Sequence, residues 1–478
     1  MKVSRERWSR DFRGWFREVI FNSGVYEYRY PIKGVGIWPP YGMKLRRYVL
    51  NILKRLLEER GHEEVLFPTL IPEEYLRKES EHIRSFEKEI FWVTRGGKEA
   101  LKERLALRPT SETAIMPILK LWVKSHADLP LRIYQIVNIF RSETKATHPL
   151  IRLREVTTFK EAHTVHATFE EAERQVSEAV RIYCKFFDEL GIPYLISRRP
   201  NWDKFAGALY TLAFDTLLPD GRTLQIGTVH NLGQNFSKAF DVTYLTPEGK
   251  HEYIYTTSYG ISERVIAALI GIHGDDHGLV LPPNVAPIQV VIIPIYYNEE
   301  ERRAVVKEVE GVEGELKRNG IRVYVDKRED VTPGEKFYYW ELKGVPLRVE
   351  IGPKDVKEGK VTLVRRDTLE KWSVSKEVLL IEVRKAFSVI QRDLRERAWK
   401  WFRERIVRAS DLEKALKFIN EGKIVEMPWC GRGECGLKIE EKLSCKVLGV
   451  DISQGKVSGK CVLCNNEAKY YVRIAKSY

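Results

Sequence analysis

Residues 132–143, with the sequence RIYQIVNIFRSE, constrain the fold of this chain more than any other segment. Apolar residues alternate before Arg141, which predicts a buried β-strand. Side chains two residues apart on a strand project to the same face, so Arg141 and Glu143 should lie side by side. A loop at 144–150 and a second strand at 151–155 are expected to follow. A salt-bridged surface hairpin is the alternative, but it explains poorly why Arg141 ends a run that should be buried.

This charged strand end has a chemistry of its own. A guanidinium such as that of Arg141 can hold an α-phosphate through two hydrogen bonds, and a carboxylate such as that of Glu143 can accept one from an adenine amino group. The segment therefore predicts a site at which a phosphate and a base bind together.

The whole chain separates into three regions by pattern. Residues 1–283 mix helices and strands without regular alternation, which predicts an α+β domain built on an antiparallel sheet. A Pro-rich breaker at 281–287 precedes residues 284–374, whose alternating strands and helices predict an α/β domain with a parallel or mixed sheet. Residues 375–478 begin with a long basic helix and end in a Cys- and Gly-rich tail, for which we expect a small α+β domain. The expected helices are 1–25, 43–60, 114–123, 265–272, 299–319, 333–342 and 375–407, and the further expected strands are 64–67, 289–293, 321–326, 347–352 and 360–366.

The charge balance favours one kind of partner. The formal net charge is +13, which attracts polyanions such as nucleic acid, although a basic proteome is the alternative explanation. No segment approaches the ~20 apolar residues of a membrane span, and the N-terminus lacks a signal-peptide run. We therefore expect a cytoplasmic protein whose cysteines are reduced and available for a metal.

Residues 108–113, RPTSET, place hydroxyls and a carboxylate at the start of an apolar helix. Thr110 or Ser111 could cap that helix, with Glu112 in its first turn. The functional interpretation is capture of a substrate ammonium by Thr110 and Glu112. The two interpretations are compatible.

Two later segments offer further polar groups. Gln225 and Thr228 could contact a nucleotide, and His230 a small substrate, although a lone histidine is more often structural. At 260–264, GISER, Arg264 lies in the first turn of an apolar helix, where the helix dipole prefers anions. A phosphate bound at this glycine-led helix start would explain the mismatch.

The cysteines of the tail are spaced as metal ligands. Cys430 and Cys435 form one pair and Cys461 and Cys464 another, which predicts a structural four-thiolate Zn²⁺ site. Cys445 could replace one ligand but has no close partner.

Residues 34–68, in which the helix expected at 43–60 leads into the strand expected at 64–67, precede these segments. Together they resemble the three signature motifs of the class II aminoacyl-tRNA synthetases: motif one at 34–68, motif two at 140–155 and motif three at 260–264. Within that class the chain resembles the prolyl-tRNA synthetases of the archaeal and eukaryotic type over essentially its full length. The specific marks are 108–112 (RPTSE), 148–155 (HPLIRLRE) with 161–163 (EAH), 225–233 (QIGTVHNLG) and 352–355 (GPKD).

The resemblance implies ATP and Mg²⁺ for activation of L-proline, transfer to the 3′ end of tRNA(Pro), and a homodimer. Its residue roles are as follows: Arg141 and Arg264 are catalytic; Thr110, Glu112, Arg141, Phe159, Glu161, His163 and His230 form the proline site; Arg141, Glu143, Arg152, Gln225, Thr228, Ser262 and Arg264 bind ATP. It also implies that the second region binds the anticodon, through Arg348, Glu350, Lys354 and Asp355, although a strand-end salt bridge is an alternative for these four. The C-terminal tail, ending at Tyr478, is expected to fold back toward the active site.

Two alternatives remain open. One is another synthetase of the same subclass, of the threonyl or histidyl type. The other is a catalytically silent synthetase-like RNA-binding protein, which we would expect to have lost Arg141, Glu143 or Arg264. The interval 142–263 is too short for the inserted editing domain of bacterial-type relatives, so we expect no hydrolysis of mischarged alanyl-tRNA.

Overall fold

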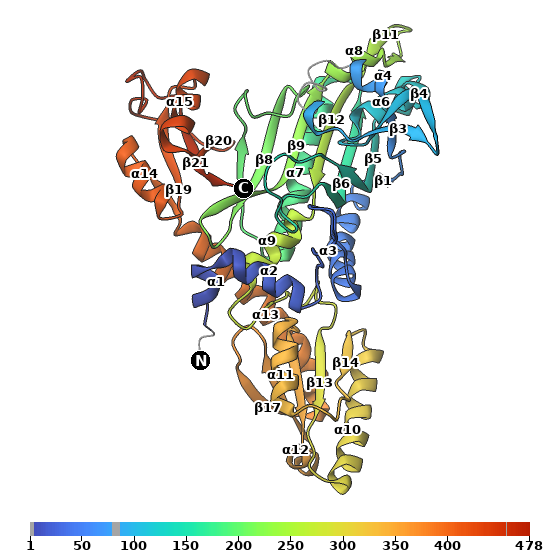
Figure 1. Ribbon diagram of the computed structural model, residues 1–478, viewed down its shortest axis with the longest axis vertical. Coiled ribbons are helices and arrows are strands. Elements are labelled where there is room, and N and C mark those ends of the chain that lie inside the picture. The colour runs from blue at the N-terminus through green and yellow to red at the C-terminus, as the bar shows by residue number, and fades with distance from the viewer. Residues whose placement is uncertain (1–3, 79–86, 456) are drawn as a thin grey trace.

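A computed structural model gives the structure of the protein and describes residues 4–78, 87–455 and 457–478. Within these residues, one sheet of eleven strands dominates the molecule (Figure 1). In spatial order its strands are β1 (Glu63–Glu64), β5 (Leu131–Phe140), β6 (Glu155–His166), β12 (Tyr255–Ile261), β9 (Arg222–Gly233), β8 (Tyr210–Leu217), β7 (Leu195–Arg198), β20 (Lys446–Asp451), β21 (Tyr470–Ser477), β19 (Ile424–Trp429) and β18 (Ile406–Arg408). The six strands from β5 to β7 pair antiparallel throughout, which confirms the predicted antiparallel sheet.

Three helices cover this sheet. They are α3 (Pro40–Glu58), α7 (Phe169–Leu190) and α9 (Arg264–His273). The Thr168 side chain caps the start of α7, and Gly191, in the left-handed region, ends the helix. Nearly every residue of α9 is buried, as its continuous apolar sequence predicts.

The N-terminal segment differs from the single helix expected at 1–25, of which residues 1–3 lie outside the described part. It forms α1 (Glu6–Arg10) and α2 (Phe12–Asn22). Asp11 separates the two, because its side chain accepts a hydrogen bond from the Gly14 backbone N at 3.1 Å and so starts a new helix. The expected apolar face is nevertheless buried from Trp8 to Ile20.

The strand expected at 151–155 starts later in the structure. The prediction of a strand at 151–155 is wrong, since β6 begins at Glu155 and continues to His166. Residues 148–152 instead fold into a tight loop in which His148 and Arg152 pair through their backbones. Smaller elements surround this end of the sheet: β2 (Leu70–Pro72), α4 (Glu73–Lys78), β3 (Trp92–Gly96), β4 (Glu99–Leu107), α6 (Glu112–Trp122), α8 (Asn235–Phe240), β10 (Thr243–Leu245) and β11 (His251–Tyr253).

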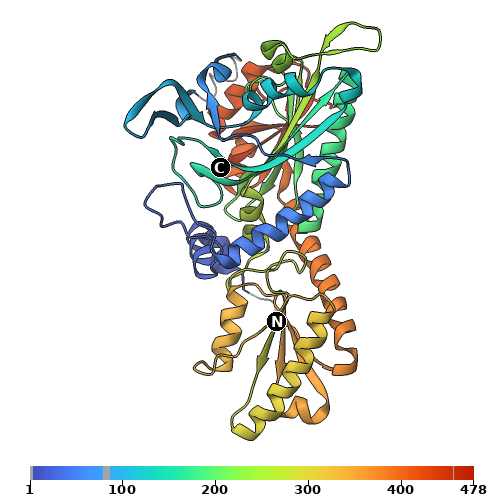
Figure 2. The same ribbon diagram turned by 90° about the vertical axis from the view of Figure 1, so that its right-hand side faces the viewer.

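The second region is a separate α/β unit at the lower end of the molecule (Figures 1 and 2). Its five strands lie in the order β14 (Val323–Val325), β13 (Val290–Pro294), β15 (Leu347–Ile351), β16 (Lys360–Arg365) and β17 (Lys371–Ser375). Its helices are α10 (Glu299–Arg318), α11 (Pro333–Leu342) and α12 (Pro353–Glu358). The sheet is mixed, as predicted, because β13 pairs parallel with both neighbours and the later strands pair antiparallel. The pattern did not predict β17 and α12.

The third region joins the large sheet. Its long helix is α13 (Leu379–Arg403), followed by α14 (Leu412–Asn420) and α15 (Gly433–Leu443). Strand β20 pairs with β7, and the last strand, β21, pairs in parallel with β9. The C-terminus therefore lies beside the strand that carries Gln225 and Thr228. Among the described residues, no helix combines the length and apolar character needed to cross a bilayer.

Candidate active site

A cavity of about 290 Å³ opens on the antiparallel face of the large sheet. Strands β5, β6, β12, β9 and β8 form its floor, and the starts of α6 and α9 close its ends. The site residues expected from the sequence that line it are Thr110, Glu112, Arg141, Glu143, Arg152, Phe159, Glu161, Gln225, Thr228, His230, Ser262 and Arg264. His163 is buried beside Glu161, outside this lining.

One end of the cavity carries a buried carboxylate. Glu112 is 2 % exposed, and its two oxygens accept hydrogen bonds from the Thr110 hydroxyl and from the Ser258 hydroxyl, the latter at 3.1 Å. Ser111 makes no capping hydrogen bond to α6, so neither hydroxyl acts as the side-chain cap considered above. The hydroxyls of Thr110 and Ser258 instead fix the Glu112 carboxylate, which can accept hydrogen bonds from a cation.

A second carboxylate lies deeper on β6. Glu161 accepts hydrogen bonds from the Ser111 hydroxyl and from Gln135 Nε2, the latter at 2.8 Å, and it lies 3.3 Å from His163 Nε2. Burial alone would raise the pKa of Glu161, but the hydrogen bond and charge of His163 hold it below its ordinary value. Burial likewise opposes protonation of His163, and the Glu161 carboxylate outweighs it and raises the pKa of His163. The two side chains form a buried pair, with Glu161 at the cavity lining and His163 behind it.

His230 forms the wall opposite Glu112. Its Nδ1 lies 2.9 Å from the Thr211 hydroxyl, and its ring lies against that of Phe205, with centroids 4.7 Å apart. Burial lowers the pKa of His230 to about 4, so the ring is neutral at physiological pH. The rings of His230 and Phe205 therefore present uncharged surfaces to the cavity, which suit an apolar ring or chain.

The other end of the cavity is cationic. Arg141 extends from the end of β5, where its guanidinium donates to the Pro109 carbonyl at 3.3 Å. Burial lowers the pKa of Arg141. The ordinary pKa of a guanidinium is so high that the group nevertheless stays charged. Arg152 Nε lies 3.8 Å from Glu143, which keeps these two side chains at the same edge. Such an arrangement can bind phosphate oxygens and a base amino group.

Arg264 completes the cationic end from the first turn of α9. Its Nε donates to the Ile151 carbonyl at 2.8 Å, and its backbone N lies 3.4 Å from the Ser262 hydroxyl. Burial and, to a lesser extent, the nearby cations Arg141 and Arg152 together lower the pKa of Arg264 to about 10, so it remains protonated at neutral pH. Three arginines thus converge where a polyanion would neutralise them.

Some lining residues were not predicted. Asp203, Lys204 and Phe205 belong to a loop between β7 and β8, and Thr211 and Ser258 lie on β8 and β12. The loop has no periodicity that could place it against the cavity. The only signal was its local composition, in which two aromatic residues flank two charged ones between Pro200 and Gly207.

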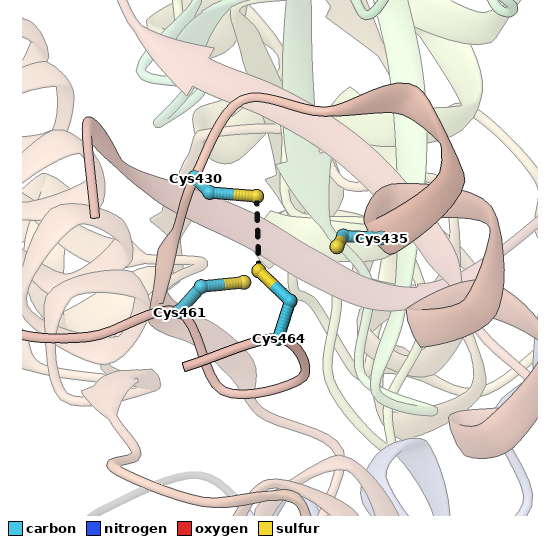
Figure 3. A group of neighbouring side chains, drawn as sticks. All are labelled: Cys430, Cys435, Cys461 and Cys464. Carbon is cyan, nitrogen blue, oxygen red and sulfur yellow. Dashed lines mark hydrogen bonds between the residues drawn. The ribbon is translucent and has the colours of Figure 1, made fainter. Parts of the chain in front are cut away.

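The four predicted cysteine ligands come together beside α15 (Figure 3). Their sulfur atoms all lie within 4.8 Å of one another, and Cys464 Sγ lies 3.6 Å from Cys430 Sγ. A tetrahedral Zn²⁺ ion with Zn–S bonds of ~2.3 Å sets its sulfurs ~3.8 Å apart, so the four thiols fit this ion. Cys445 is not part of the cluster.

The four residues considered for anticodon contact differ in how far internal partners already bind their side chains. Arg348 lies between Glu341 and Glu350, 2.8 and 2.9 Å from their carboxylates, and Glu350 also accepts from Lys371. Asp355 accepts from the Gly352 backbone N and the Thr362 hydroxyl. Lys354 is 88 % exposed and lies 3.9 Å from Glu358.

Family models match three stretches of the chain. Residues 91–273 match the tRNA synthetase class II core domain (G, H, P, S and T), residues 289–386 an anticodon binding domain, and residues 412–478 a prolyl-tRNA synthetase C-terminal domain. Together these models cover most of the chain, and the four-cysteine cluster lies within the third.

Full-length relatives are also known. The chain is 57 % identical to the proline–tRNA ligase of Metallosphaera sedula, over 100 % of both chains. It is 56 % identical to the proline–tRNA ligase of Pyrobaculum islandicum, over 97 % of this chain and 96 % of that one. The solved structure of Giardia lamblia prolyl-tRNA synthetase in complex with prolyl-adenylate superimposes with a TM-score of 0.95 at 37 % identity, covering 100 % of this chain and 99 % of that one.

Proposed function

The chain belongs to the prolyl-tRNA synthetase family, and we propose that it activates L-proline with ATP and transfers it to the 3′ end of tRNA(Pro) in the cavity described above. The observation that carries this proposal is the pairing of a buried, hydroxyl-fixed Glu112 at one end of a single cavity with three arginines at the other. An amino acid has an ammonium group and a carboxylate, and ATP brings phosphates, so the two ends of the cavity match the two reactants.

The residue roles follow from this arrangement. We assign the secondary ammonium of proline to Glu112 and Thr110, and its apolar ring to the space bounded by His230 and Phe159. Glu161 and His163 support this end from behind, since the Ser111 hydroxyl donates to Glu161. The proline carboxylate then extends toward Arg141.

We assign ATP to the cationic end. Arg141 bridges the proline carboxylate and the α-phosphate, and Arg264 binds the leaving phosphates. Glu143 and Arg152 contact the base edge and the phosphates. Gln225, Thr228 and Ser262 line the remaining wall and complete the nucleotide site.

Activation needs no general base, because the attacking proline carboxylate is already an anion. It requires that carboxylate and phosphorus be aligned and that the charge on departing pyrophosphate be neutralised. Arg141 aligns the two reactants, and Arg264 stabilises the negative charge that develops as the bond to pyrophosphate breaks. Glu143, which lines the nucleotide end of the cavity, would help to hold a Mg²⁺ ion there, and this ion would supply additional positive charge.

The remaining parts of the molecule receive roles consistent with the family. We propose residues 1–283 as the catalytic domain, 284–374 as the anticodon-binding domain and 375–478 as a zinc-binding domain. In the second of these, Lys354 is the most exposed of the four residues considered for the anticodon, while Arg348, Glu350 and Asp355 would bind RNA only by exchanging internal partners. The reaction serves translation, which places the protein in the cytoplasm.

We further propose a homodimer. Strand β1 is one of the two edge strands of the large sheet, and the segment 30–70 that carries it has several exposed apolar side chains, namely Tyr30, Ile32, Ile37, Leu66 and Leu70. Exposed apolar residues beside an unpaired strand edge are typical of a protein interface. Analytical ultracentrifugation at micromolar concentration should therefore give twice the monomer mass.

One assay tests the proposed activity. Purified protein is incubated with ATP, labelled pyrophosphate and each of the twenty amino acids in parallel, and formation of labelled ATP is followed. We expect the highest exchange with proline. Exchange that is greatest with threonine or histidine would favour another synthetase of this subclass, and no exchange with any amino acid would favour a catalytically silent RNA-binding protein.

A further inference from the structure

Loop 199–206 forms one wall of the amino-acid end of the cavity. Asp203, Lys204 and Phe205 line the cavity, and Phe205 packs on His230. The loop connects β7 to β8 and belongs to no helix or strand. Its position is therefore set by contacts with neighbouring parts of the molecule and not by a backbone ladder of its own.

The Trp202 side chain of this loop contacts the four-cysteine unit, which we define as residues 429–436 and 461–464. A Cβ atom built on Gly436 would lie 2.2 Å from Trp202 Cη2, so the indole packs directly against the backbone there. Trp202 also packs edge-on against Trp429, with ring centroids 6.1 Å apart. Gly436 follows the ligand Cys435, and Trp429 precedes the ligand Cys430. The indole therefore lies against the two backbone positions that present the first pair of thiols.

Two charged contacts reinforce this junction. Arg199, which is 7 % exposed, donates from Nη1 to the Leu448 carbonyl at 2.6 Å. Its Nη2 donates to Asp215 at 2.8 Å and to Gln225 Oε1 at 3.0 Å, which joins the same loop to the nucleotide end of the cavity. Lys446 lies 3.6 Å from Asp203. The start and the middle of the loop are thus tied to the C-terminal region.

We propose that Trp202 is a positioning residue that couples the four-cysteine unit to the amino-acid cavity. A metal ion bound to the four thiols holds residues 429–436 rigid, and the indole seated on that backbone holds loop 199–206 against His230. The four-cysteine unit then acts on amino-acid binding at a distance, in addition to stabilising its own domain. This inference rests on the proposed function only for its kinetic consequence, since the mechanical coupling is measurable without substrate.

The chain offers a matched pair of variants for the test. Gly433 and Gly436 both lie in α15, neither is a metal ligand, and alanine favours a helix at both positions. A Cβ on Gly433 would lie 3.6 Å from Trp202 Cζ3, an ordinary contact, whereas on Gly436 it must displace the indole. The variant Gly436→Ala therefore disturbs the junction, and Gly433→Ala is its control.

The first measurement is amide hydrogen exchange of residues 199–206, read by mass spectrometry on the zinc-loaded protein. We expect Gly436→Ala to speed exchange there about tenfold, and Gly433→Ala to leave it unchanged, with equal zinc content in both. Removal of zinc from the wild-type protein with a chelator should speed exchange in the same residues, while β9 and β12 stay protected. Equal exchange of the loop in wild type, Gly436→Ala and zinc-free protein would overturn the proposal.

The second measurement separates positioning from a general loss of structure. Trp202→Ala should raise the KM for proline about tenfold while changing the KM for ATP less than about twofold, and Trp202→Phe should recover part of the loss. If Trp202→Ala leaves both the KM for proline and the exchange of the loop unchanged in an active enzyme, the coupling is absent. A wild-type protein that shows no proline-dependent activity, yet shows the expected hydrogen-exchange pattern, would contradict the proposed function and support the coupling.

Discussion

Three buried carboxylates line this cavity, and hydrogen-bond donors fix the orientation of each. Glu112 accepts from two hydroxyls, Glu161 from a hydroxyl, an amide and a histidine, and Glu263 from the Thr157 backbone N and hydroxyl. A carboxylate fixed in this way loses little entropy when a ligand binds, because its rotamer is already chosen. The specificity of the site is therefore built into residues that are ordered before the substrate arrives.

Replacement of Glu112 tests the ammonium site. The variant Glu112→Gln keeps the size of the side chain and removes the charge. Its Oε1 can still accept from one of the two hydroxyls, while its NH2 group must donate to the oxygen of the other. Hydrogen bonds to charged groups contribute about 1.5–3 kcal/mol, so the KM for proline should rise about 10- to 100-fold, with the KM for ATP within about twofold. Proline-dependent pyrophosphate exchange measures both constants, and Thr110→Ser, which retains the hydroxyl donor, is the control. A parallel rise in both KM values would place Glu112 elsewhere in the reaction.

Replacement of Glu263 tests how burial acts on stability. Burial raises the pKa of Glu263 to about 7, although the two hydrogen bonds from Thr157 oppose the shift. Between the unfolded pKa of about 4.3 and this folded value, the folded protein keeps a proton that the unfolded chain releases. The contribution of this group to stability therefore falls as pH rises through that window and is constant above it.

The variant Glu263→Gln cannot ionise, and its Oε1 can still accept both hydrogen bonds. We expect it to match the wild type near pH 4.5 and to exceed it at pH 8 by up to about 4 kcal/mol, since one pKa unit corresponds to ~1.4 kcal/mol. Thermal unfolding of both proteins at the two pH values gives the comparison. If the wild type instead becomes more stable relative to the variant as pH rises, Glu263 ionises readily in the folded protein.

At the scale of elements, the sequence predicted most of the helices and strands whose apolar residues recur at a regular spacing. Strand β5, helices α3, α9, α10 and α11 and the order of the α/β region follow from apolar spacing, and the Thr332 capping box fixes the start of α11. The short spacing within each of the two cysteine pairs likewise predicted the cluster that the four cysteines form. Each of these depends on residues that are near one another in sequence.

The features that could not be predicted depend on long-range contacts. Strand β6 starts at Glu155 because the backbones of His148 and Arg152 close a loop before it, and the alternation of residues 151–155 gives no sign of that loop. Loop 199–206 reaches the cavity because Trp202 is held by a segment more than two hundred residues later in the chain. The pairing of β21 with β9 is equally distant in sequence.

Strand β21 gives a prediction at this scale. The Tyr478 ring packs edge-on against His148, with centroids 5.8 Å apart, and its hydroxyl donates to Asp220 at 2.7 Å. The loop that begins at His148 carries Arg152 and the Ile151 carbonyl to which Arg264 donates. Tyr478 therefore supports the nucleotide end of the cavity from outside.

Deletion of Ser477 and Tyr478 should lower the rate of proline activation about tenfold, because the loop at 148–152 loses its support. Tyr478→Phe keeps the ring contact and should stay within about twofold of the wild type. Pyrophosphate exchange at saturating proline and ATP measures the rate. An unchanged rate in the truncated protein would show that the tail has no part in activation.

At the scale of the whole molecule, the three regions are joined by specific contacts. The C-terminal strands extend the catalytic sheet, and at the other end Arg366 forms a buried two-point ion pair with Asp275, with both N–O distances 2.7 Å. Arg366 follows β16 of the α/β unit, and Asp275 follows α9, whose first residue is Arg264. The unit proposed to read the anticodon thus contacts the helix that carries a proposed catalytic arginine.

The interval between Arg141 and Arg264 determines what the molecule can do after activation. Residues 142–263 are used entirely by β6 to β12, the connecting helices α7 and α8 and their loops, so they contain no inserted domain with a second, hydrolytic cavity. The amino-acid end must therefore achieve selectivity by binding alone. Loss of a methylene contact contributes only about 1–3 kcal/mol, which corresponds to a 10- to 200-fold preference.

Alanine, which is smaller than proline and has the same two charged ends, should therefore be activated at a measurable rate. Alanine lacks two of the methylenes of the proline ring, so we expect alanine-dependent pyrophosphate exchange with a kcat/KM roughly 100- to 40,000-fold below that of proline. Alanyl-tRNA(Pro), prepared separately and mixed with the enzyme, should be lost no faster than in buffer, because the described residues offer no second site for its hydrolysis. Enzyme-dependent deacylation in this assay would show that the synthetic cavity itself hydrolyses the mischarged product, and the His230→Ala variant, which changes the wall facing the amino acid, would then test whether the hydrolysis takes place there.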